Sequence, residues 1–123
     1  MPIIRSDESP RFELPFLVVH GLASPRRGAA ETCVWRLSLA PGAPPVPHAV
    51  TREEIFVATA GAAEVSLAGQ ASTLRAGDAL VVPAGVEFSL GNSSTEPFEA
   101  IVAFPVGGTA VTEAGELRPP WTE

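Results

Sequence analysis

The chain has 123 residues, of which 46% are hydrophobic, and a formal net charge of −6. This length fits one domain with a single core. An acidic chain without basic clusters is a poor partner for nucleic acid or an anionic membrane surface, and no apolar run is long enough to cross a bilayer. One cysteine, Cys33, excludes an internal disulfide. We therefore expect a cytoplasmic protein that binds neither nucleic acid nor membrane.

Short apolar or alternating segments predict strands along most of the chain. The clearest segment, residues 32–40, alternates, with Trp35, Leu37 and Leu39 on one face and Arg36 on the other. Glycine- and proline-rich turns separate the segments, and none shows a sustained helical period. The pattern predicts an all-β sandwich or barrel, and periodicity does not choose between the two. The predicted strands cover residues 16–19, 32–40, 55–60, 64–67, 80–82, 86–90 and 99–104.

Two spaced motifs are the most informative feature of the sequence. The first reads Gly42, five residues, His48-Ala49-Val50, three residues, Glu54, six residues, Gly61. The second reads Gly77, five residues, Pro83-Ala84-Gly85-Val86-Glu87-Phe88, three residues, Asn92. In both spacings the chain resembles the cupin superfamily, in particular its small single-domain members of the conserved-barrel type.

The resemblance implies a cupin β-barrel, also called a double-stranded β-helix or jelly roll, with six or more antiparallel strands and little helix. It places motif 1 at residues 42–61 and motif 2 at 77–92 of a single domain spanning 1–123. Residues 1–14 and 107–123 are then peripheral arms, and we expect Trp121 to pack its ring on the domain surface. The resemblance also implies a homodimer, because dimerisation covers exposed sheet edges.

The resemblance further implies a metal site that this chain fills only in part. In the family, positions 48, 50 and 88 would be histidines and position 54 a glutamate, but here Val50 and Phe88 replace two ligands. His48 and Glu54 remain as metal candidates, whereas such sites normally draw three or four protein ligands. We therefore expect either no cofactor or a weakly held divalent transition metal, namely iron, manganese, nickel or zinc.

The same positions predict a mostly apolar cavity. On continuous strand the even-numbered residues His48, Val50, Glu54 and Phe56 would share one side, which the resemblance makes the interior, where Phe88 and Leu90 would join them. A buried Glu54 must be paired, hydrogen-bonded or neutral with a raised pKa, and His48 is the obvious partner.

Two roles for these polar residues stay open. His48 and Glu54 either form a catalytic acid–base couple or only satisfy each other and orient a ligand. Arg36 points either to solvent or into the cavity, where it would clamp a carboxylate or phosphate.

The sequence therefore predicts a single-domain cupin that binds a small organic ligand in a cavity lined by His48 and Glu54. Two enzyme classes are the alternatives. One is a metal-dependent cupin enzyme of the dioxygenase, isomerase or cyclase type. The other is a metal-free acid–base catalyst that uses His48 and Glu54.

Overall fold

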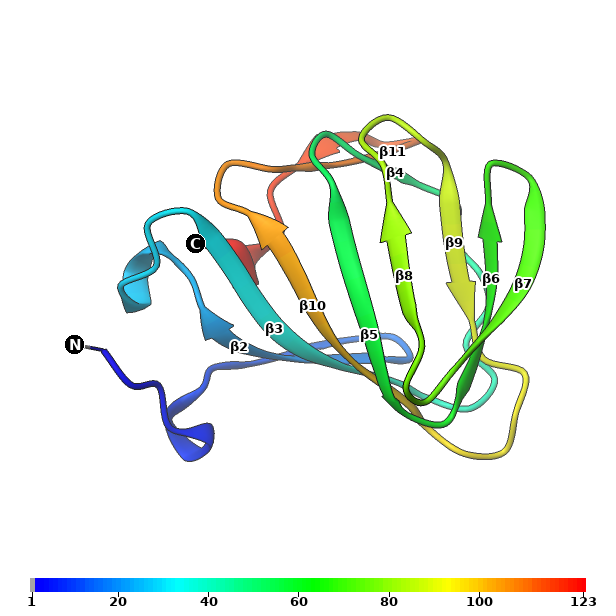
Figure 1. The fold of residues 1–123 in the computed structure, drawn as a ribbon, viewed down its shortest axis with the longest axis horizontal. Coiled ribbons are helices and arrows are strands. Elements are labelled where there is room, and N and C mark those ends of the chain that lie inside the picture. Colours follow the sequence, from blue (N-terminus) through cyan, green and yellow to red (C-terminus); the bar gives the residue numbers. More distant parts are fainter. Residues whose placement is uncertain (1) are drawn as a thin grey trace.

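The computed structural model describes residues 2–123, whose regular structure is almost entirely β-strand (Figure 1). The strands are β1 (Arg11–Leu14), β2 (Leu17–Ala23), β3 (Thr32–Leu39), β4 (Ala49–Val50), β5 (Glu54–Ala60), β6 (Ala62–Leu67), β7 (Gln70–Arg75), β8 (Ala79–Val82), β9 (Phe88–Gly91), β10 (Phe98–Pro105), β11 (Ala110–Thr112) and β12 (Gly115–Leu117). The regular structure also includes three short 3-10 segments: η1 (Ser6–Glu8), η2 (Pro25–Arg27) and η3 (Pro120–Thr122). No helix in this range is long and apolar enough to cross a membrane.

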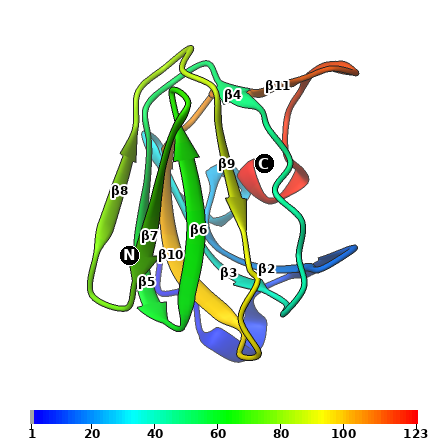
Figure 2. The same ribbon diagram turned by 90° about the vertical axis from the view of Figure 1, so that its right-hand side faces the viewer.

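The strands form one long sheet and two short ones, and every pairing is antiparallel. The long sheet has the order β1-β2-β3-β10-β5-β8, and the short sheets have the orders β7-β6-β9 and β12-β11-β4. In the turned view, the β7-β6-β9 sheet stands in front of the long sheet (Figure 2). This layered all-β arrangement confirms the fold class expected from the sequence.

The hydrophobic core lies between these sheets. It includes Trp35 from β3, Phe56 from β5, Val102 from β10, Val65 from β6 and Phe88 from β9. Period-2 alternation supplies the inward residues, as β3 and β10 show with buried and partly exposed positions in strict succession. Burial of one face on each strand fixes the strand register, and the register places the cavity described below.

Residues of the two motifs hold the turns beside the core. Gly61 joins β5 to β6 at φ +75°, and an added Cβ would lie 2.3 Å from the Pro97 carbonyl oxygen, so only glycine fits. The buried Asn92 donates from Nδ2 to the carbonyl oxygens of Leu39 (3.0 Å) and Glu96 (2.9 Å). Its Oδ1 accepts from the backbone N–H of Ser94 at 3.0 Å. The motif ends are therefore structural anchors.

Both chain ends contribute to the barrel. β1 lies within the stretch expected as an N-terminal arm, and it pairs with β2 from Arg11↔His20 to Leu14↔Leu17. In the C-terminal stretch, β11 pairs with β4, and η3 brings Trp121 against the core. The Cys33 thiol donates to the carbonyl oxygen of Thr122 at 3.5 Å, which fastens the tail to β3.

Candidate functional site

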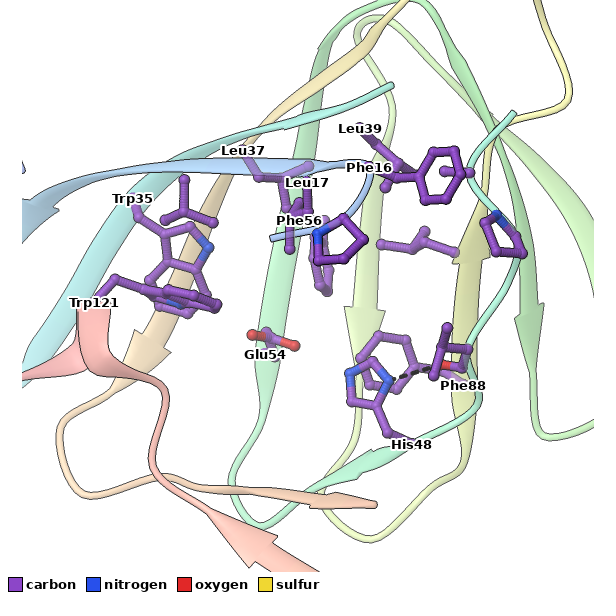
Figure 3. A pocket seen from close by; sticks show the side chains of 16 residues that line it. Phe16, Leu17, Trp35, Leu37, Leu39, His48, Glu54, Phe56, Phe88 and Trp121 are labelled. Atoms are coloured by element: carbon purple, nitrogen blue, oxygen red, sulfur yellow. Dashed lines mark hydrogen bonds between the residues drawn. The ribbon is translucent and has the colours of Figure 1, made fainter. Parts of the chain in front are cut away.

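A cavity of about 400 Å³ lies inside the barrel and is partly open to solvent. Its walls come from β2, β3, β5 and β9, from the β1–β2 turn, from the segment before β4, and from η3 (Figure 3). The lining is aromatic and aliphatic except for one imidazole and one carboxyl group. The lining residues are Pro15, Phe16, Leu17, Val19, Trp35, Leu37, Leu39, Ala43, Pro44, Val46, His48, Glu54, Phe56, Phe88, Leu90 and Trp121.

Glu54 is the buried acidic residue of the cavity and is only 6% exposed. It is the first residue of β5 and faces inward with Phe56, two positions later. Within residues 2–123 no ion pair or side-chain hydrogen bond reaches its carboxyl group. Burial therefore acts uncompensated and raises the pKa of Glu54 from 4.5 to about 8. At neutral pH the carboxyl group is mostly protonated.

His48 enters the cavity beside Phe88. The two residues form an isolated antiparallel bridge, in which each backbone N–H donates to the other's carbonyl oxygen at 3.0 and 2.8 Å. Their ring centroids are 4.4 Å apart. The Nδ1 atom of His48 lies 3.0 Å from the carbonyl oxygen of Val46. Because a carbonyl oxygen only accepts, Nδ1 carries a proton, and Nε2 is the ring nitrogen left for a ligand.

The structure brings most of the predicted site residues together. His48, Glu54, Phe56, Phe88 and Leu90 all line the cavity. Val50 is buried at the end of β4 but does not reach the lining. Residues 51–53 are not strand, so the parity argument that joined position 50 to position 54 does not hold across this break.

Arg36 requires a correction, because the structure places it outside the cavity. On β3 the lining residues are Trp35, Leu37 and Leu39, so alternation turns Arg36 to the opposite face of the sheet. There it stands in register with His20 of β2 and Ile101 of β10. It therefore has no position from which to clamp a ligand in this cavity.

The sequence analysis missed the two tryptophans of the lining. Trp35 and Trp121 lie with ring centroids 6.1 Å apart and form one wall of the cavity. The alternation of β3 could have identified Trp35, because it shares a face with Leu37 and Leu39. No spacing or motif connects Trp121, close to the end of the chain, with residues more than 60 positions earlier.

The residues present do not fit a firmly held metal ion. Within residues 2–123 no group of three or more His, Cys, Asp and Glu side chains is placed to hold one. Val50 and Phe88 stand where the resemblance requires imidazoles, and the Nδ1 atom of His48 is already bonded to Val46. The donor set is therefore one imidazole nitrogen and one protonated carboxyl group, which falls short of the usual three or four ligands.

Comparison with known proteins identifies the family. The sequence model of the cupin domain matches residues 35–104, more than half of the chain, and the chain therefore belongs to the cupin family. The match runs from β3 to β10 and includes both motifs. No curated protein matches the chain in sequence.

Several solved structures share the fold at low sequence identity. The polyketide cyclase RemF from Streptomyces resistomycificus superposes with a TM-score of 0.76 and 16% identity, over 85% of this chain and 79% of that one. An RmlC-like cupin from Shewanella frigidimarina superposes with a TM-score of 0.73 and 18% identity, over 84% of this chain and 88% of that one. KdgF from Halomonas sp. superposes with a TM-score of 0.66 and 20% identity, over 82% of this chain and 91% of that one. Identities this low show a common fold and nothing about substrates.

The lone buried carboxyl group predicts a stability that depends on pH. Because the pKa of Glu54 is about 8 folded and 4.5 unfolded, its contribution is fully present below pH 4.5 and is lost as pH rises toward 8. We expect the free energy of unfolding of Glu54→Gln to equal that of the parent near pH 4.5. At pH 9 the variant's value should be higher by several kcal/mol, because each unit of pKa shift corresponds to about 1.4 kcal/mol. Urea unfolding at several pH values measures this difference.

The matched control is Glu53→Gln, which changes the exposed neighbour of Glu54 in the same way. Its difference from the parent should stay within about 0.5 kcal/mol across the same pH range. A Glu54→Gln difference that is equally flat would show that Glu54 ionises normally in the folded protein.

Proposed function

We propose that this chain binds a small, mostly apolar organic molecule in the barrel cavity. One observation carries the proposal: a cavity of about 400 Å³ with an almost wholly apolar lining holds a single carboxyl and a single imidazole group. Ligand sites of proteins are commonly of this size and combine apolar walls with a few polar groups that fix orientation. Glu54 and His48 are the groups that would orient the ligand.

The fold neighbours agree with such a use of the barrel without identifying the ligand. Among them are proteins described as a polyketide cyclase and as a salicylate 1,2-dioxygenase, both of which act on organic molecules. Binding is better supported here than catalysis by a coupled His–Glu pair, because no hydrogen bond joins Glu54 to His48 in the described residues. A metal-dependent reaction would need ligands beyond those two.

We further propose that any transition metal is held only weakly at this site. Protein purified without chelator should contain well under one equivalent of iron, manganese, nickel or zinc per chain, because the donor set is incomplete. Elemental analysis measures this content. The double variant Val50→His with Phe88→His, which restores the family's ligand types, should retain more metal than the parent. Near-stoichiometric metal in the parent that disappears in His48→Ala would contradict the proposal.

Ligand binding can be tested with a neutral apolar dye, N-phenyl-1-naphthylamine, which fluoresces when it leaves water. The dye should saturate at one site per chain and should quench the protein's emission, since both tryptophans, Trp35 and Trp121, line the cavity. Val46→Asp puts a charge in the cavity lining at a side chain that is 62% exposed, where folding is little affected. We expect it to weaken dye binding by about tenfold or more.

The matched control is Val81→Asp on the edge strand β8, where the valine is 48% exposed and lies outside the cavity lining. Its dye affinity should stay within about twofold of the parent. Absence of saturable binding, or equal effects of the two variants, would show that the dye does not occupy this cavity.

A further inference from the structure

The charge inventory of the cavity limits the kind of ligand that it accepts. Among residues 2–123, Glu54 and His48 are the only ionisable side chains in the lining, and no arginine reaches it. A carboxylate or phosphate on the ligand would therefore be buried beside an acidic group with no arginine to pair with it. Burial of an unpaired charge costs far more than burial of a hydroxyl or carbonyl group. The cavity thus disfavours an anionic ligand.

Aromatic rings lie on either side of Glu54 in the lining (Figure 3). Trp121 packs 6.1 Å from Trp35 and 5.9 Å from Phe12, as measured between ring centroids. On the other side, Phe88 lies 5.9 Å from Phe56. Such rings pack with a planar aromatic ligand through offset or edge-to-face contacts that an aliphatic ring cannot reproduce.

Trp121 is held in this wall by the tail that carries it. The tail lies outside the segment that matches the cupin domain, residues 35–104. Thr122 is buried and accepts a hydrogen bond from the Cys33 thiol at its carbonyl oxygen. The backbone N–H of Arg26 donates to the carbonyl oxygen of Glu123 at 2.9 Å. Two attachments thus fix the indole ring against the cavity.

Two ionisable residues, Glu54 and His48, line the cavity. Figure 3 shows Glu54 and His48 at one end of the cavity, with Phe16 and Leu39 toward the other. Phe16 is 49% exposed and sits in the left-handed region at φ 66°, an unusual backbone conformation for a bulky residue. A ligand with one polar end can reach the carboxyl group and the free Nε2 atom while its remaining surface contacts apolar side chains.

Building on the function proposed above, we propose that the ligand is a non-anionic, planar aromatic molecule with one polar end, and that Trp121 is a specificity-determining residue for its ring. Glu54 and His48 hydrogen-bond the polar end. Trp121 supplies the aromatic contact that selects planar rings over saturated rings of similar size.

Competition against N-phenyl-1-naphthylamine tests the role of Trp121. Naphthalene and decalin have the same ten-carbon skeleton, but only naphthalene is planar and aromatic. We expect the ratio of their affinities to shift by about fivefold against naphthalene in Trp121→Leu and by less than about twofold in Trp121→Phe, which keeps a ring. Each variant's own dye affinity and melting temperature are measured alongside. If Trp121→Leu weakens both competitors by the same factor, Trp121 only holds the tail and the inference is wrong.

A second competitor pair tests the charge requirement in the parent protein. At pH 7, 2-naphthylmethanol should bind at least about tenfold more tightly than 2-naphthoate, which carries a carboxylate in place of the alcohol. Equal or tighter binding of 2-naphthoate would overturn the assignment of a non-anionic ligand. These failures differ from failure of the proposed function itself, in which neither the dye nor any competitor binds.

Discussion

A carboxyl group buried without a cationic partner is the constraint around which this site is built. Glu54 is 6% exposed, and burial alone raises its pKa to about 8. Burying an ionised, unpaired carboxylate would cost free energy comparable to the net stability of a fold, so the group stays protonated at neutral pH. A protonated carboxyl group both donates and accepts hydrogen bonds. The proposals of a non-anionic ligand and of weak metal binding both build on this state.

The barrel produces this environment through simple alternation. β5 turns Glu54 and Phe56 inward, β3 turns Trp35 and Leu37 inward, and the bridge between His48 and Phe88 closes the opposite wall. Of the four positions at which the resemblance implies metal ligands, His48, Glu54 and Phe88 line the cavity, whereas Val50 does not reach it. With Phe88 where the resemblance implies an imidazole, the lining has one donor fewer and is more apolar.

Sequence reasoning predicted the fold well because the motif spacings encode turns, and turn residues such as Gly61 and Asn92 act locally. It placed His48, Glu54 and Phe88 at one cavity because these three positions belong to the same two spaced motifs. It left Arg36 open between solvent and the cavity, because alternation fixes which residues share a face but not which face is inside. It also missed β7, whose six residues are almost all exposed and show no alternation, and Trp121, whose place depends on contacts far away in the chain.

The central claim is that Glu54 is uncharged in the folded protein near neutral pH. A carbon-13 NMR titration of glutamate side-chain carboxyl groups measures this directly, with the Glu54 signal assigned by its loss in Glu54→Gln. The account predicts a midpoint near pH 8 for that signal. A midpoint near 4.5, the value of an ordinary glutamate, would mean that Glu54 is charged or paired in a way that contradicts the account.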